Sequence, residues 1–473
     1  MPDLSIATRS GGTTVLRAAT LDTFGAAFRG QLIRAGDAQY DQARAIWNAM
    51  IDRRPALIAR CSGAADVMRC VKFAAEHELR VAVRSGGHNI AGNALCNDGL
   101  VIDLSAMRSV RVDTARRIAH VGPGATLGDF DHEAQAFGLA TPLGINSTTG
   151  VAGLTLGGGF GWLSRKYGLA IDNLLSADVV TANGELVSAS AKKHPDLFWG
   201  VRGGGGNLGV VTSFEFRLHR VGPEVLSGLI VHPFAAARDV IGHYRSFVAR
   251  APRELTVWIV LRKAPPLPFL PQNVHGTEVL VVAACYVGPK ARGERVLQPL
   301  RKFGKPIADV IGASPYAGWQ QAFDPLLTPG ARNYWKSHNF TELGDAAVNT
   351  ILDYAGRLPS PHSEIFVAHL GGATNEVPPR ATAYPHRDVS FVLNVHTRWE
   401  DRGQDSRCVA WAREFFDATA PFATGGVYVN FISEGEDRVG AAYGANYDRL
   451  ARLKRRYDPK NLFSLNQNVP PKR

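Results

Sequence analysis

Cysteine is scarce in this sequence, which has 5 cysteines and 4 methionines among 473 residues. The cysteines are odd in number and none forms a Cys-x-x-Cys pair, which excludes a disulfide framework and a zinc ribbon. We therefore expect a reducing compartment and no metal site. Disorder is excluded too, because 45% of the residues are hydrophobic and 22 are phenylalanine. The cysteines are Cys61, Cys70, Cys96, Cys285 and Cys408.

Long apolar runs are also missing. No stretch approaches the ~18 apolar residues of a membrane span. Residues 1–28 lack the basic start and unbroken apolar run that define a signal peptide. These absences predict a cytoplasmic protein with no membrane partner.

Dense basic runs are absent although the formal net charge is +11. The largest local cluster is Arg452, Lys454, Arg455 and Arg456, which we interpret as the solvated face of a helix. We expect no nucleic-acid partner, because nucleic-acid binders concentrate basic residues among aromatic ones. A diffuse positive field suits a small anionic ligand, such as a dinucleotide cofactor.

Several common catalytic motifs do not occur. The sequence has no Walker A motif, no His-Glu-x-x-His and no Gly-x-Ser-x-Gly, which excludes the usual nucleotide hydrolases, zinc proteases and α/β-hydrolases. Gly204, Gly206 and Gly209 form a formal Gly-x-Gly-x-x-Gly. Because β-branched residues follow them instead of a helix, we reject a Rossmann fingerprint.

Glycine, by contrast, is abundant and unevenly placed. Of the 49 glycines, many fall in four loops between Arg84 and Gly209: RSGGHNIAG, GPGATLG, GVAGLTLGGGFG and RGGGGNLG. Short β-prone runs separate these loops, and helical periodicity predicts helices over 64–79 and 126–138. The pattern predicts an α+β domain whose loops present backbone amides.

The composition changes near residue 220. The glycine loops thin out, and strand-like runs such as LTVWIVLR and TEVLVVAACYVG alternate with helical segments. Residues 264–273 (APPLPFLPQN) are typical of a proline-rich surface loop. Further strands are expected over EIFVAHLGG, VSFVLNVHTRW and GVYVNFI, with helices over 405–420 and 441–457. We place a domain boundary near 220.

The first glycine loop has the chemistry of an anion site. Successive amides of Ser85, Gly86 and Gly87 can form a nest for a phosphate, and we expect Arg84 at its mouth. His88 follows the turn. On these residues alone, an incidental hydrogen-bonding role for His88 stays open beside a functional one.

Four motifs together resemble the berberine bridge enzyme-like oxidases, within the vanillyl-alcohol oxidase or PCMH-type FAD superfamily. They are RSGGH, GVAGLTLGGGFGWLSRKYGLAIDNL, HPDLFWGVRGGGGNLGVVTSFEF and YDPKNLFSLNQNVPP. The resemblance covers nearly the whole chain. It implies an FAD-binding part over 1–220 (core about 50–220), a substrate part over 221–425 with an antiparallel sheet backed by helices, and a segment over 426–473 that returns to the FAD-binding part.

The resemblance also implies how the flavin is held. It makes His88 the residue linked covalently to FAD, and it puts Asn146 where many members carry a second, cysteine link, so we expect attachment through His88 only. Thr149 lies where members tune oxygen access, which favours an oxidase. The rest of the expected cofactor shell consists of Gly150, Val151, Gly153, Gly157, Gly158, Gly159, Val211, Asn466 and Asn468.

Catalysis in such an enzyme needs a base that takes a proton while hydride leaves for the flavin. The resemblance points to Tyr428, with Asn430 on the same face of the expected GVYVNF strand, and Tyr384 is a second candidate. A packing role for either tyrosine stays open. His386 and Arg387 either bind a substrate anion or pair with Asp388.

The aromatic residues Trp319, Tyr334 and Trp335 are expected to border the substrate pocket. The resulting hypothesis is an FAD-dependent oxidase of secondary metabolism that moves hydride from an alcohol, sugar or natural product to flavin N5, with O2 as acceptor. The alternatives are a dehydrogenase with another acceptor and a non-catalytic flavin-binding homologue. We expect a monomer or homodimer with a small-molecule substrate.

Overall fold

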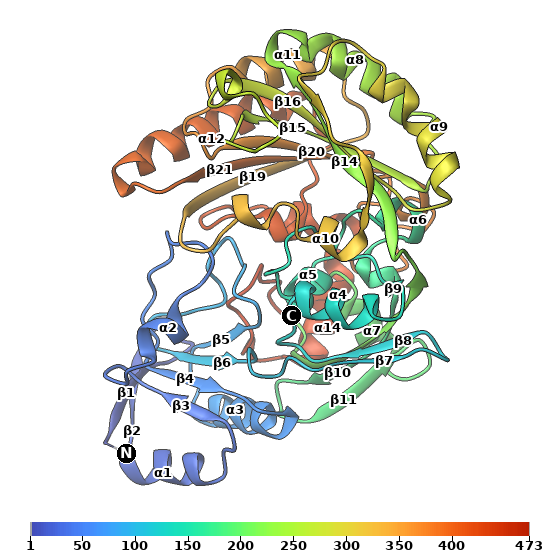
Figure 1. Cartoon of the computed structure of the whole chain (residues 1–473). Helices are drawn as coiled ribbons and strands as arrows, with labels where there is room; N and C mark the ends of the chain where they lie inside the picture. The colour runs from blue at the N-terminus through green and yellow to red at the C-terminus, as the bar shows by residue number, and fades with distance from the viewer. Residues whose placement is uncertain (1, 473) are drawn as a thin grey trace.

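Three β-sheets with their own helices form most of the computed structural model, which describes residues 2–472 (Figure 1). Two smaller sheets lie in the lower half of Figure 1, and one large sheet lies in the upper half. Strands and helices mix throughout, and the α+β class expected from the sequence is confirmed.

The first sheet has the strand order β3-β4-β6-β5, and its last three strands are parallel. The helix predicted over 64–79 is α3 (Ala64–Glu76), and its buried Val67, Cys70 and Val71 share one face. It leads into β5, which ends at the first glycine loop. The elements here are β1 (Leu4–Ala7), β2 (Thr13–Leu16), α1 (Ala18–Ala26), β3 (Gln31–Ile33), α2 (Tyr40–Arg44), β4 (Leu57–Arg60), β5 (Val81–Arg84) and β6 (Leu100–Asp103).

The second sheet is antiparallel, with the order β11-β10-β12-β8-β7. The helix predicted over 126–138 is α4 (Leu127–Gln135). It begins at a capping box in which Thr126 and Asp129 satisfy each other's amides. The remaining elements are β7 (Val110–Asp113), β8 (Ile118–Val121), β9 (Leu139–Ala140), α5 (Val151–Leu156), α6 (Ser164–Tyr167), β10 (Leu174–Val180), β11 (Leu186–Ser190), α7 (Pro195–Val201), β12 (Val210–Arg217) and β13 (His219–Arg220).

The large sheet has the order β17-β14-β16-β15-β20-β21-β19, with β18 also paired to β14. Its interior strand β16 (Glu278–Tyr286) is buried from Val279 onward, because both faces of the sheet are covered. The other elements are β14 (Glu224–Pro233), α8 (Ala237–Val248), β15 (Leu255–Lys263), α9 (Lys290–Arg301), β17 (Ala308–Asp309), β18 (Gly312–Pro315), α10 (Tyr316–Gln320), β19 (Arg332–Phe340), α11 (Asp345–Ala355), β20 (Glu364–His369), β21 (Phe391–Trp399) and α12 (Asp405–Thr419).

The two faces of the large sheet have different partners. Helices α8, α9, α11 and α12 cover the outer face in Figure 1. The inner face, including Val281 and Ala283 of β16, turns toward the smaller sheets and the loops between them. An inner face enclosed in this way leaves room for a site between the large sheet and the glycine loops.

The C-terminal segment differs from its prediction in two ways. The strand expected over GVYVNFI is wrong, because Val429–Phe431 forms a 3₁₀ turn. The final helix is split into α13 (Val439–Tyr443) and α14 (Tyr447–Tyr457), and α14 packs on α7. Arg452, Arg455 and Arg456 are exposed on α14 as expected, but Lys454 is fully buried.

Within residues 2–472, no helix is both long enough and apolar enough to cross a membrane. The same residues contain no group of three or more His, Cys, Asp or Glu side chains arranged to hold a metal ion. All five cysteines are buried as free thiols.

Candidate functional site

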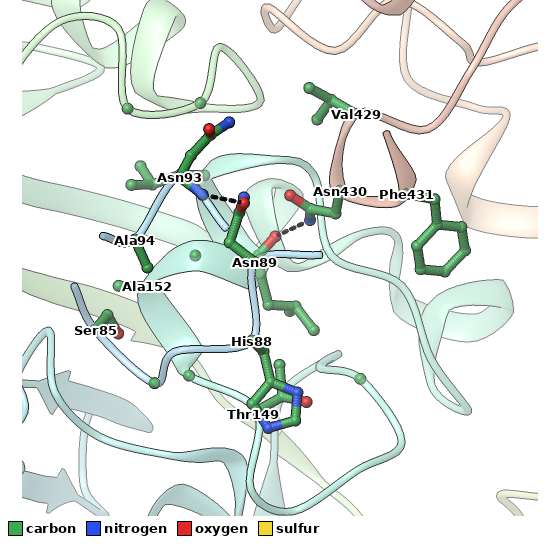
Figure 2. A pocket seen from close by; sticks show the side chains of 18 of the residues that line it. Ser85, His88, Asn89, Asn93, Ala94, Thr149, Ala152, Val429, Asn430 and Phe431 are labelled. Atoms are coloured by element: carbon green, nitrogen blue, oxygen red, sulfur yellow. Dashed lines mark hydrogen bonds between the residues drawn. The ribbon is translucent and has the colours of Figure 1, made fainter. Parts of the chain in front are cut away.

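One cavity of about 350 Å³ lies where the glycine loops and the C-terminal segment meet the inner face of the large sheet. Figure 2 shows the cavity from close by, with Asn430 and Phe431 reaching it from the C-terminal segment. Twelve of the predicted catalytic and cofactor-binding residues line it: Ser85, Gly86, Gly87, His88, Asn146, Thr149, Gly150, Gly153, Val211, Tyr428, Asn430 and Asn466.

The first and third glycine loops touch each other at the floor of this cavity. A Cβ on Gly86 would lie 2.4 Å from the amide nitrogen of Gly150, and one on Gly150 would lie 2.6 Å from the amide nitrogen of Gly86. Only two glycines permit this approach. Gly87 has φ +71°, so the backbone turns directly before His88. The two loops thus form one surface.

His88 is held from two sides. Its ring stacks on Trp47 with centroids 5.1 Å apart, and its Nε2 lies 2.8 Å from the hydroxyl of Thr148. Burial lowers the pKa of His88 to about 3, so the imidazole is neutral at pH 7. Figure 2 shows the ring beside Thr149.

Asn146 controls the hydrogen bonds around Thr148. Its Nδ2 donates to the carbonyl of Leu327 at 3.4 Å, and its Oδ1 accepts from the Thr148 amide at 3.0 Å and hydroxyl at 2.7 Å. Because the Thr148 hydroxyl has a single proton, it must accept from Nε2–H of His88. The lone pair of the neutral ring is then on Nδ1.

The glycines at 157–159 make room for protein side chains. They do not line the cavity. A Cβ on Gly157 would lie 2.2 Å from Oδ1 of Asn430, and one on Gly158 would lie 3.2 Å from the Tyr384 ring. Gly153 and Gly206 differ, because neither has a protein atom within 3.8 Å of a built Cβ. Those two positions leave backbone open to the cavity.

Tyr428 and Asn430 meet although they do not lie on a strand. The Tyr428 hydroxyl accepts from the Gly159 amide at 3.1 Å and from Nδ2 of Asn430 at 2.9 Å. Burial raises the pKa of Tyr428 to about 12, against the opposing effect of these two donors. Asn430 is fixed further by a bond from Nδ2 to the Leu154 carbonyl at 3.1 Å.

Tyr384 lies behind the cavity wall. It is buried, does not line the cavity, and its hydroxyl has no hydrogen-bond partner among the described residues. Burial raises the pKa of Tyr384 further above its ordinary value. Arg387 was expected either to bind a substrate anion or to pair with Asp388. Both predictions are wrong, because the Arg387 guanidinium forms an ion pair with Asp172 at 2.7 Å. His386 contacts the carbonyl of Ala442 at 3.0 Å.

The other predicted cofactor residues divide between the cavity and the layer behind it. Arg84 is not at the mouth, because its guanidinium turns under the loop to the carbonyl of Ala43. Val151 is buried at the start of α5 and does not line the cavity. Asn466 and Asn468 each keep a buried Oδ1 without a partner in the described structure, and Asn466 lines the cavity.

A row of charged side chains that the sequence analysis missed crosses the inner face of the large sheet. Arg262, Glu364 and His396 stand opposite one another on β15, β20 and β21. Glu364 contacts Nη1 of Arg262 at 2.8 Å and Nδ1 of His396 at 3.1 Å. Burial alone raises the pKa of Glu364, but Arg262 and His396 bring it down to about 2.

The alternation of side chains along a strand is the sequence signal that could have identified this row. Glu364 and Phe366, like Asn394 and His396, lie two residues apart and line the cavity together. Polar residues at alternate positions of a buried strand point to a site. Of the aromatic residues expected there, Trp335 lines the cavity, whereas Trp319 and Tyr334 do not.

Known proteins share both the sequence and the fold. Residues 55–190 match the family model described as FAD binding domain, and residues 427–470 match the one described as berberine and berberine like. The chain is 33% identical to (R)-6-hydroxynicotine oxidase of Paenarthrobacter nicotinovorans over 457 residues, which cover 94% of this chain and 97% of the relative.

Two solved structures extend this likeness. The crystal structure of 6-hydroxy-D-nicotine oxidase from Arthrobacter nicotinovorans is 30% identical with a TM-score of 0.84, covering 94% of this chain and 98% of that one. Xylooligosaccharide oxidase from Myceliophthora thermophila, solved with xylobiose, is 26% identical with a TM-score of 0.83, covering 96% and 100%.

Proposed function

Because the chain belongs to the berberine-like family of FAD-linked oxidoreductases, we propose that it is an oxidase that takes hydride from a small molecule and passes the electrons to O2. That it is an FAD-dependent oxidoreductase follows from the family. The observation that supports the finer proposal is that the glycine loops line the same cavity as Tyr428, Asn430 and His396.

The residues around the cavity fit FAD. The joined loops at Gly86 and Gly150 offer backbone amides for a diphosphate, and the open backbone at Gly153 and Gly206 admits a flat ring system. The buried Oδ1 of Asn466 still needs a donor. FAD, when bound, supplies the hydride acceptor. We also propose that residues 1–220 and 426–473 hold the cofactor and residues 221–425 the substrate.

Covalent attachment through His88 alone is part of the proposal. The neutral imidazole and its free Nδ1 lone pair support it, because a nucleophilic nitrogen is required for a bond to carbon. Asn146 occupies the position of a second link and has no thiol. The five cysteines do not line the cavity.

Tyr428 is the proposed base. The two donors at its oxygen stabilise the phenolate form, and this phenolate takes up the proton of the substrate hydroxyl to become the neutral tyrosine. Asn430 holds the hydroxyl in place. The pKa of about 12 means that few molecules carry the phenolate at pH 7, so the step speeds up as the pH rises.

Anaerobic mixing tests this function. A panel of secondary alcohols, oligosaccharides and cyclic natural products is mixed with the purified holoprotein, and loss of flavin absorbance at about 450 nm is followed. We expect at least one compound to bleach the flavin and air to restore its colour with one peroxide per turnover. Bleaching that only an artificial acceptor reverses would favour a dehydrogenase. A protein purified without flavin would overturn the proposal.

A further inference from the structure

The proline-rich loop over 264–273 packs on the large sheet and borders a second, apolar cavity. Pro265, Leu267 and Phe269 are half-buried and line it, whereas Pro266 and Pro268 between them are exposed. This alternation gives the loop one apolar inner face. The segment expected to be a surface loop therefore forms one wall of a space of about 60 Å³, which we call the annex.

The annex lies directly beside the main cavity. Ile145, Trp258, Leu327, Glu364 and Phe366 line both spaces. On the far side, the inner-face residues of β14 and β16, including Leu229 and Val281, close the annex. Only these shared side chains separate the two spaces among the described residues, so a ligand that extends between them from the main cavity would reach the annex.

The chemistry of the annex wall selects an apolar group. Among the described residues, the charged side chains that line the annex are Arg262 and Glu364, and they pair with each other at 2.8 Å. A sugar ring would place hydroxyls against aliphatic and aromatic side chains, and each unpaired hydroxyl would weaken binding by about 5- to 150-fold. An alkyl or aryl group gives up no hydrogen bond when it binds there, and its apolar surface is removed from water, which favours binding.

Resting on the proposed oxidase function, we infer that the substrate is amphipathic. Its oxidisable polar head lies in the main cavity near Tyr428, and an apolar tail lies in the annex under Leu267 and Phe269. The proline-rich loop is therefore a specificity element of this enzyme. The polar row from Arg262 to His396 marks the junction at which the substrate changes from polar to apolar.

The test uses 4-methyl-, 4-propyl- and 4-hexylphenol as probes of the holoprotein, with Kd read from perturbation of the flavin absorbance. Each buried methylene is worth about 0.8 kcal/mol, or about fourfold in Kd. We expect Kd to fall about 15-fold from methyl to propyl, which adds two methylenes. Leu267→Trp fills the annex and should remove this dependence while leaving the Kd of 4-methylphenol within about twofold.

Pro268→Trp is the matched control, because it puts the same bulk on the exposed side of the loop, and it should behave as wild type. Phe269→Ala should deepen the annex and favour 4-hexylphenol over 4-propylphenol, with an unchanged melting temperature to show intact folding. Equal Kd for all three probes in wild type would overturn the inference, as would equal losses in Leu267→Trp and Pro268→Trp. Either result leaves flavin bleaching, and so the proposed oxidase function, intact.

Discussion

Lys454 is the residue whose loss should cost the site most, although it lies outside the cavity. Its side chain is fully buried, and Nζ donates to the Asn207 carbonyl at 2.9 Å, to Asp458 at 2.7 Å and to the Phe463 carbonyl at 2.9 Å. All three ammonium protons are therefore used. One side chain joins the fourth glycine loop to the segment that brings Phe463 and Asn466 to the cavity.

Lys454→Met keeps the length of the side chain and removes its charge and donors. The Asp458 carboxylate keeps the Leu462 and Phe463 amides, at 2.7 and 2.9 Å, but loses its counter-charge. Breaking one partner of a buried ion pair costs about 3–5 kcal/mol. At about 1.4 kcal/mol per factor of ten, local opening of the segment should rise by about 10² to 10⁴.

Hydrogen exchange read by mass spectrometry measures that opening in peptides covering 204–209 and 462–469. Flavin content after gel filtration should fall with it. Arg452→Met is the control, since it removes a charge from the exposed face of the same helix. Adding Asp458→Asn to Lys454→Met should recover part of the loss. Exchange increased by less than about fivefold in Lys454→Met would refute the reasoning.

Three further predictions concern the cavity itself. Tyr428→Phe should slow anaerobic flavin reduction by about 10² to 10⁴, and it should abolish the rise of the wild-type rate between pH 7 and 10 that a pKa of about 12 predicts; Tyr384→Phe should change neither, and an unchanged rate in Tyr428→Phe would rule it out as base. His88→Ala should leave all flavin extractable by acid precipitation, and Thr148→Val should lower the covalent fraction because the Nε2 proton loses its acceptor; flavin still bound covalently in His88→Ala would contradict the single link. Glu364 has a pKa of about 2 in the folded protein, below its ordinary value of 4.5, so its contribution to the stability of the fold is complete above pH 4.5 and is lost as the pH falls toward 2. The melting temperature of Glu364→Gln should therefore fall less steeply than that of the wild type between pH 4.5 and pH 2. Parallel plots of melting temperature against pH for the two proteins would refute this.

The cofactor-binding loops could be predicted from the sequence because they depend on the local conformation of the backbone. The RSGGH turn needs Gly87 at positive φ whatever surrounds it, and the loops at Gly86 and Gly150 contain glycine because backbones touch there. Such requirements produce short, recognisable sequence motifs. The family and the cofactor were predicted from those motifs, and the comparisons confirm both.

The roles of Gly157 and Gly158 could not be predicted from the sequence in the same way. Gly157 and Gly158 have the same residue type as Gly153, yet they accommodate Asn430 and Tyr384 from segments more than 200 residues away. Similarly, Lys454 looked like one more surface charge beside Arg455. Its partners Asn207 and Phe463 are known only once α14 is packed.

The sequence by itself determined the family, the cofactor and the loops that face it, because a tight turn or a missing Cβ is a property of a few consecutive residues. The tertiary structure alone decided which side chains face the substrate. Arg262, Glu364 and His396 come from three strands, and only the register of the large sheet places them in one row. The annex has the same origin, since an apolar loop becomes a pocket wall only when a sheet lies beneath it.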